Sequence, residues 1–466
     1  MHASTSGALA GPLLALWAFA APAESGVALQ PRDGELRDRF EMRAYSETYA
    51  ELFRRALLPG PNGALVTHAT VAPVHQYASL RVDNLDAPWR RDSLDLELAA
   101  WGRTWVGRRD SERRLDADIQ VASATYRHGR LALRVGRQYV AGGAARFARF
   151  DGIEARARLG HGLDLQVYGG WTALPRWNQR PRYEHLGAAT DASLQDTASL
   201  ESTDRRDHWL SGGRLSWAAA EHRAGLSIHE QHEQGGLTKR NAGVDARTAP
   251  FAGATLGANA VFELGRRRLA DARLWLDTSL TRTADVALEL LHTEPALFLS
   301  NQSVLSVFGS AAFDEVGSYA TWRAHPDINL HGAGFVQVYA GERPGARAEL
   351  GTRFFADAAH TTFARLTYSR VATPDNGYHS LRAALSRRFA LRLRGTLEAY
   401  AYLYDRPVRG YRSSSVFAGT VALDPIPPLS VLWGASLART PYALVDLQSQ
   451  LRVSYTFDLP PPRRRR

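Results

Sequence analysis

The sequence contains no cysteine in its 466 residues, only two methionines and a single lysine, Lys239. The lack of cysteine excludes disulfide bonds, and it permits a periplasmic or surface location without requiring one. Long apolar runs are also missing, because no stretch beyond the N-terminus approaches the ~18 to 20 consecutive apolar residues of a transmembrane helix. A helical membrane protein is therefore excluded.

Arginine and aromatic residues, in contrast, are plentiful. Of the 57 basic residues 56 are Arg, and they exceed the 47 acidic residues to give a net charge of 57 − 47 = +10. The chain also has 11 Trp, 17 Tyr and 17 Phe. The Arg residues alternate with apolar residues along short tracts rather than clustering with aromatic residues in one patch, so nucleic acid is not an expected partner.

The N-terminal segment has the pattern of an export signal. An apolar run over residues 9–21 ends in the small-residue motif Ala21-Pro22-Ala23, which fits cleavage before Glu24. No Lys or Arg precedes the apolar run, and the alternative is a short buried helix. We expect residues 1–23 to be a signal peptide.

After this segment, apolar and polar residues alternate with a period of two. Leu94, Leu96 and Leu98 alternate with Asp95 and Glu97. This period is typical of half-exposed β-strands. Comparable tracts occupy residues 115–121, 131–135, 153–159, 163–167, 391–403 and 447–457.

The connections between tracts are of two kinds, which tend to alternate along the chain. Tight connections occur at 128–130, 160–162 and 219–221, and longer ones at 140–149, 172–208, 294–313, 370–377 and 405–411. Short turns at one rim and long loops at the other are the layout of outer-membrane barrels. We therefore predict an all-β fold over residues 93–458. It is a transmembrane antiparallel up-and-down β-barrel of about 20 strands, with a range of 18 to 22, in the outer membrane of a Gram-negative bacterium.

Aromatic residues near tract ends fit the interfacial girdles of such a barrel. Examples are Trp101, Trp171, Trp217, Tyr402 and Tyr455. A soluble sandwich or propeller is the alternative, since its strands alternate too. The strongly charged faces opposite the apolar ones favour the membrane barrel.

The two ends of the chain leave alternatives open. Residues 24–92 are expected to be a periplasmic segment or to supply the first strands, because tracts at 40–53 and 75–83 would raise the total to 22. The spacing of Tyr45 and Tyr49 also fits an amphipathic helix. Residues 459–466 form a basic C-terminal tail, which we expect to be disordered or, alternatively, a docking peptide.

A short motif gives a more specific resemblance. Gly136-Arg137-Gln138, followed after a glycine-containing stretch by Asp151-Gly152, resembles the strand-loop-strand signature of alginate-export-type outer-membrane porins. From about residue 40 the chain also resembles the myxobacterial outer-membrane barrels associated with exopolysaccharide export. The resemblance implies a pore for an extended, hydrophilic and anionic chain.

Charged residues opposite the apolar positions are expected to line the lumen, because Arg on the lipid face costs ~2 to 4 kcal/mol at mid-membrane. Cross-strand ion pairs that brace a polar wall are the alternative role for any single Arg. Together, the excess of Arg would attract carboxylated polymers and small anions. The expected lumen residues are Arg134, Arg156, Arg158, Arg273, Arg347, Arg353, Arg382, Arg392, Arg394, Arg452, Glu154, Glu349 and Glu398.

Two of the long connections are candidates for narrowing the pore. Residues 294–313 are too apolar to remain in water, and they carry the constriction candidates Phe298, Leu305 and Phe308. The loop could instead pack across the outer rim. Residues 172–208 form the longest connection and are the second candidate.

The sequence shows no convincing catalytic or metal site. The run His229-Glu230-Gln231-His232-Glu233 is one residue short of the H-E-x-x-H zinc pattern. We expect no enzyme activity, no metal and no cofactor.

The function that we expect is an outer-membrane channel that exports a hydrophilic, anionic exopolysaccharide. A general or anion-selective diffusion porin is the first alternative, and a structural or adhesive barrel without an open pore is the second. The expected partners are outer-membrane lipid and lipopolysaccharide, a polysaccharide or small anionic solutes, and a periplasmic polysaccharide-export protein.

Overall fold

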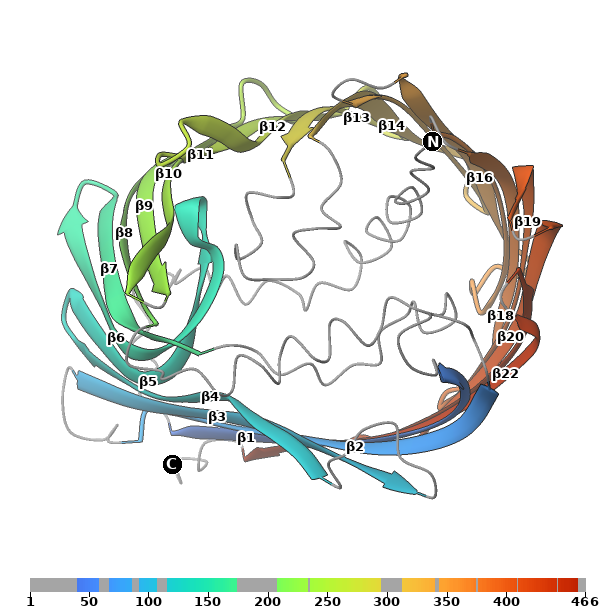
Figure 1. Cartoon of the computed structure of the whole chain (residues 1–466), viewed down its shortest axis with the longest axis horizontal. Coiled ribbons are helices and arrows are strands. Elements are labelled where there is room, and N and C mark those ends of the chain that lie inside the picture. Colours follow the sequence, from blue (N-terminus) through green and yellow to red (C-terminus); the bar gives the residue numbers. More distant parts are fainter. Residues whose placement is uncertain are drawn as a thin grey trace, which may run out of the picture.

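The computed structural model places 22 antiparallel strands in one sheet that curves into a ring (Figure 1). It describes residues 40–57, 67–85, 92–106, 115–173, 208–233, 235–294, 312–339, 343–373, 376–408, 410–441 and 443–459. The signal peptide and the basic tail expected from the sequence lie outside the described residues, apart from Leu459. No helix in the described part of the chain is long and apolar enough to cross a bilayer.

The strands follow one another around the ring in chain order, and each is hydrogen-bonded to the next. The first eleven are β1 (Glu41–Leu57), β2 (Thr67–Asp83), β3 (Asp92–Val106), β4 (Leu115–His128), β5 (Leu131–Gly142), β6 (Arg146–Gly160), β7 (Leu163–Thr172), β8 (Trp209–Ala219), β9 (His222–Glu233), β10 (Gly236–Thr248) and β11 (Ala254–Glu263). The others are β12 (Arg268–Ser279), β13 (Ala284–Thr293), β14 (Phe313–His325), β15 (Ile328–Tyr339), β16 (Gly345–Phe355), β17 (Thr362–Ala372), β18 (Gly377–Ala390), β19 (Leu393–Val408), β20 (Tyr411–Ile426), β21 (Leu429–Thr440) and β22 (Ala443–Leu459).

The ring is closed because the last strand pairs with the first. The antiparallel register of β22 with β1 runs from Leu459 opposite Met42 to Ser449 opposite Leu52. A closed sheet has no free edge, so every strand finds backbone partners on both sides. The prediction of an all-β up-and-down barrel is confirmed, with a strand number at the upper end of the expected range.

The N-terminal tracts are strands of this barrel, and the helical alternative is wrong. Tyr45 lies opposite Ser79 and Tyr49 opposite His75 in the β1–β2 register. Residues four apart on a strand point to the same side of the sheet, as they also do on a helix, which is why their spacing alone was ambiguous. The barrel therefore begins at Glu41.

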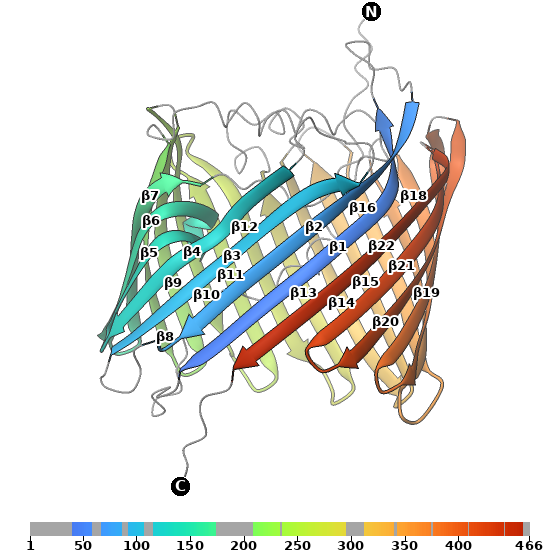
Figure 2. The ribbon, with the colours of Figure 1, turned by 90° about the horizontal axis from the view of Figure 1, so that it is seen from below.

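Large apolar side chains cover the outside of the barrel. On β13, Leu288 and Leu290 are each 49% exposed, and comparable Leu, Val and aromatic residues are exposed on strands all around the ring. The residues between them carry the charges, as expected where one face meets hydrocarbon and the other water. The strands cross this apolar zone at a steep tilt (Figure 2).

The aromatic residues divide between the two faces. Trp171, Trp217 and Tyr455 are exposed on the outer face, where a girdle is expected. Trp101 is only 4% exposed and lies opposite Asp118, on the face that carries the charges, and Tyr402 occupies the same face of β19 as Glu398. The girdle prediction is therefore wrong for Trp101 and Tyr402.

Tight turns alternate with the other connections, as predicted. The turns at 129–130, 161–162 and 220–221 each contain a residue with positive φ, which two-residue hairpins require. Two of the connections predicted to be long, 140–149 and 405–411, are mostly strand. Only the 3-10 turn Gly143–Ala145 separates β5 from β6, and only residues 409–410 separate β19 from β20.

The orientation of the wall can be tested with Arg substitutions at neighbouring positions of β13. Leu288→Arg would place a guanidinium in lipid and should lower the free energy of unfolding by about 2–4 kcal/mol. The control Ala287→Arg should lower the free energy of unfolding much less. Residue 287 faces the inside of the barrel, beside Asp277 and Tyr319. Urea titration of the barrel in phospholipid vesicles measures both. Equal losses would show that the assigned outer and inner faces are incorrect.

Candidate functional site

The inner face of the barrel carries most of the charged residues that the sequence singled out. They occupy strand positions that alternate with the exposed apolar residues. Arg392 differs, because it lies in the turn between β18 and β19 rather than in a strand. The residues on inner strand positions are Arg134, Arg156, Arg158, Arg273, Arg347, Arg353, Arg382, Arg394, Arg452, Glu154, Glu349 and Glu398.

Many of these Arg side chains form cross-strand ion pairs. The N–O distance is 2.8 Å between Arg134 and Glu97, 2.8 Å between Arg347 and Glu315, and 2.9 Å between Arg382 and Glu398. Arg273 pairs with Glu289 of β13 at 2.8 Å, whereas Arg156 pairs with Glu154 of its own strand, β6. The wall thus presents both signs of charge close together, and its positive excess is much weaker than the Arg content alone suggests.

One hairpin leaves this wall and folds into the barrel. The pairing of β5 with β4 ends at Arg137 opposite Ala122, whereas β5 continues to pair with β6 as far as Gly142 opposite Arg146. Figure 1 shows this hairpin inside the ring, beside β9 and β10. We call residues 137–151 the inner hairpin.

The tip of the inner hairpin is bound to the inner wall at β9, β10 and β12. The backbone N–H of Ala144 donates to Ser227 Oγ of β9 at 2.8 Å, and Asn241 of β10 donates its side-chain N–H to the carbonyl of Ala144 at 3.3 Å. Arg146 forms an ion pair with Asp271 of β12. These contacts join the tip to three strands that follow much later in the chain.

Glycines allow the strands to bend where the inner hairpin leaves the wall. Gly136 of β5 lies opposite Gly152 of β6, which lies opposite Gly170 of β7. Gly136 has φ 113°, and a Cβ on it would lie 2.2 Å from the carbonyl oxygen of Ala122. A Cβ on Gly152 would lie 2.1 Å from a backbone oxygen of β7. No larger residue fits either position, so the glycines of the sequence motif serve the bend.

Ion pairs hold the base of the inner hairpin. Arg137 binds both oxygens of Asp151 at 2.6 and 2.7 Å and reaches Asp118 of β4 at 3.4 Å. Arg149 also pairs with Asp118, and its Nε donates to the carbonyl of Ala173 at 2.9 Å. The side chains of Arg149 and Asp118 are only 2% and 8% exposed, so this pair is buried. Breaking a buried pair is far more costly than breaking an exposed one.

A small apolar core lies beneath the inner hairpin. Val140, Ala148 and Phe150 of the hairpin pack with Tyr168 of β7 and Leu210 of β8. The rings of Phe150 and Tyr168 are 5.8 Å apart, and Phe150 is fully buried. Burial of each large apolar side chain contributes about 1.5–3 kcal/mol. The inner hairpin is therefore a packed part of the fold.

The sequence motif thus maps onto the bend and base of the inner hairpin. Gly136 and Gly152 form the bend and Arg137 and Asp151 the ion pair, while Gln138 is fully buried and donates to the carbonyl of Gly152 at 3.1 Å. The sequence reasoning treated 140–149 as an ordinary outer loop. The signal that it missed is the placement of the apolar residues Ala148 and Phe150 two positions apart, as on a strand, and both pack in the small core.

The constriction candidates from the sequence cannot be compared with this arrangement. Phe298, Leu305 and Phe308 lie outside the described residues, as does nearly all of 172–208. The sequence reasoning also did not single out Glu315 and Glu289, which are partners of the inner Arg residues.

The two histidines of the segment that nearly matches a zinc motif, residues 229–233, lie on opposite faces of β9. His229 is 4% exposed on the inner face and forms a hydrogen bond with Tyr168 at 3.1 Å. His232 points outward and stacks on Trp209 with 3.9 Å between ring centroids. Among the described residues no group of three or more His, Asp or Glu could hold a metal ion.

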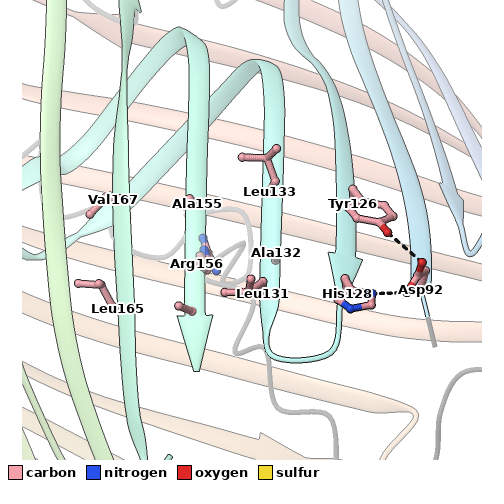
Figure 3. A pocket seen from close by; sticks show the side chains of 11 residues that line it. Asp92, Tyr126, His128, Leu131, Ala132, Leu133, Ala155, Arg156, Leu165 and Val167 are labelled. Carbon is pink, nitrogen blue, oxygen red and sulfur yellow. Dashed lines mark hydrogen bonds and ion pairs between the residues drawn. The ribbon is translucent and has the colours of Figure 1, made fainter. Parts of the chain in front are cut away.

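A hollow on the outer face of β4–β7 is lined mainly by apolar residues (Figure 3). Leu131, Leu133 and Val167 border it, and at one edge Asp92 accepts hydrogen bonds from Tyr126 at 2.8 Å and binds His128 at 2.6 Å. Because its leucines belong to the exposed apolar set, the hollow faces lipid rather than the lumen.

The chain matches no known family model, and no curated protein matches its sequence. Several solved structures match its fold at low identity. The P pilus usher translocation pore PapC is 8% identical with a TM-score of 0.44, covering 89% of this chain and 99% of its own. OccAB4 of Acinetobacter baumannii is 10% identical with a TM-score of 0.42, covering 90% and 98%. OpdK of Pseudomonas aeruginosa, solved with vanillate, is 10% identical with a TM-score of 0.42, covering 91% and 100%.

The architecture shows that the barrel belongs in a membrane. A closed antiparallel barrel with an apolar outer band and a charged inner wall satisfies its backbone internally and is suited to hydrocarbon outside and water inside. The chain is a transmembrane β-barrel of the outer membrane.

The buried ion pair between Arg149 and Asp118 predicts which substitution should destabilise the inner hairpin. Asp118→Asn removes the charge that Arg149 faces and should lower the local stability of the hairpin by on the order of 3 kcal/mol. Amide hydrogens in 137–151 should then exchange about a hundredfold faster in mass spectrometry. Asp164→Asn, at an exposed inner position of β7, is the control. Unchanged exchange in Asp118→Asn would show that this pair does not hold the hairpin.

Proposed function

We propose that the chain is an outer-membrane channel that exports a hydrophilic, anionic exopolysaccharide. The observation that carries this proposal is the inner hairpin, which occupies part of the lumen of a wide barrel whose inner wall is polar. A 22-stranded barrel is wider than the 16–18-stranded porins that already enclose a water-filled channel. A hairpin fixed inside it leaves a restricted path, as an extended chain requires.

The charges of the wall support a weakly charged polymer as cargo. Ion pairs such as Arg347–Glu315 and Arg382–Glu398 leave little unbalanced charge in one place. A wall of this kind can exchange hydrogen bonds with hydroxyl groups along a sugar chain while it tolerates scattered carboxylates. The resemblance in residues 136–138 and 151–152 to alginate-export-type porins agrees with such a cargo.

A diffusion channel for small anions is the second candidate. The packed core around Phe150 and Leu210 favours it, because a rigidly held constriction suits the passage of small solutes more than that of a thick polymer. Under either function, we propose lipid and lipopolysaccharide as the outer neighbours of the apolar band. A periplasmic polysaccharide-export protein is proposed as a partner for the exopolysaccharide channel alone.

Planar-bilayer recording tests the proposal. The purified barrel should conduct ions with a weak preference for anions, and linear hyaluronate, in which only every second sugar carries a carboxylate, should interrupt the current when added on one side and cross to the other side. Conductance without any effect of the polymer would favour the diffusion channel. The absence of conductance in both the wild type and Asp118→Asn would contradict a channel.

The role of the inner hairpin can be tested by a disulfide in this cysteine-free chain. Ala144→Cys combined with Ser227→Cys joins two contacting residues, because Ala144 N lies 2.8 Å from Ser227 Oγ. In the oxidised variant the tip is fixed to β9. The conductance should therefore stay at the lowest level that the wild-type trace shows, and it should fluctuate less. Reduction should restore the wild-type trace, and the two single-cysteine variants are the controls. If oxidation leaves the conductance and its fluctuations unchanged, the tip does not move during conduction.

A further inference from the structure

Tyrosines gather on the inner wall at β18 and β19, away from the inner hairpin. Tyr400, Tyr402 and Tyr404 take alternate positions of β19 and therefore point to the same side, about 7 Å apart along the strand. Tyr378 of β18 lies opposite Tyr404. Its ring contacts that of Tyr402 edge to face, with 5.7 Å between centroids. We call these four residues the tyrosine patch.

A charged pair adjoins the tyrosine patch and remains open to solvent. The guanidinium of Arg382, opposite Tyr400, lies 4.9 Å from the centre of that ring and 2.9 Å from Glu398. The side chains of Arg382 and Glu398 are 32% and 27% exposed. The hydroxyl of Tyr400 donates to the second oxygen of Glu398 at 2.5 Å. A ligand in the lumen can therefore reach both a fixed donor group and a fixed acceptor group.

Hydroxyl groups complete the surroundings of the patch. Ser380 and Ser414 lie on either side of Tyr402 in the register of β18, β19 and β20. Ser414 is bound to the Tyr404 hydroxyl at 2.8 Å, whereas within the described part of the chain the hydroxyl of Tyr402 has no hydrogen-bond partner. A half-buried hydroxyl without a partner has hydrogen-bonding capacity that a ligand can use.

We propose that the tyrosine patch, with Arg382 and Glu398, is a binding site for the sugar rings of a carbohydrate in the lumen. The inference rests on the proposed export function and adds a location and a chemistry for the contact. A pyranose ring has an apolar C–H face, which packs on an aromatic ring, and a rim of hydroxyls that both donate and accept hydrogen bonds.

The composition of the site favours sugars over other solutes. A hydrocarbon ligand would leave the Arg382–Glu398 pair without solvation. A phosphate-rich polymer would meet the carboxylate of Glu398 as well as the guanidinium, and only the guanidinium attracts it. A purely structural set of tyrosines would be buried, but all four rings of the patch are only partly buried.

Saturation-transfer NMR on the detergent-solubilised barrel tests the site without requiring conductance. The probe is maltoheptaose, a neutral linear sugar, and its binding should place strong transfer on the ring C–H protons. Tyr402→Ala should weaken the apparent affinity at least tenfold, since one stacked ring contributes about as much as a base stacked on an aromatic residue. Tyr402→Phe keeps the ring and should lose much less. Tyr455→Ala, on the outer face, is the matched control.

The outcomes separate this inference from the proposed channel function. Loss of binding in Tyr402→Ala, with binding retained in Tyr402→Phe and Tyr455→Ala, supports the site even if no current is found in bilayers. Equal affinity in all four proteins, or no binding to any, overturns the site and leaves the channel to be judged by its conductance.

Discussion

The structure depends first on the hydrogen bonds between β1 and β22. In hydrocarbon, an unpaired backbone N–H or C=O costs several kcal/mol, so a sheet can cross the membrane only when it has no free edge. The pairing of Met42 with Leu459 through Leu52 with Ser449 closes the sheet. Closure then fixes which residues face outward, and it provides the interior in which the inner hairpin, the ion pairs and the tyrosine patch all lie.

Closure of the sheet also explains why its outer and inner faces differ in composition. Outside, the residues need only be apolar, because lipid imposes no specific shape. Inside, charges need partners, and many partners come from nearby strands, as Glu398 of β19 does for Arg382 of β18. The inner hairpin continues this principle within the lumen, since it has its own small core and its own buried pair between Arg149 and Asp118.

The sequence predicted what depends on local alternation and missed what depends on contacts between distant strands. The period of two identified the barrel, the faces of most charged residues and the tight turns. It placed Trp101 in an outer girdle, because an aromatic residue near a strand end looks the same whichever face it occupies. It also treated 140–149 as a loop, because the partners that draw Ala144 inward, Ser227 and Asn241, are 83 and 97 residues away.

Those long separations have a consequence for the order of assembly. The tip of the inner hairpin binds β9, β10 and β12, which follow β5 and β6 in the chain. Until β12 is in place the tip lacks one of its three docking strands, although Val140 and Phe150 already have their packing partners on β7 and β8. Because contacts between distant segments form slowly, docking of the tip should be a late and separate kinetic step, and a chain truncated before β9 would lack all three strands to which Ala144 and Arg146 bind.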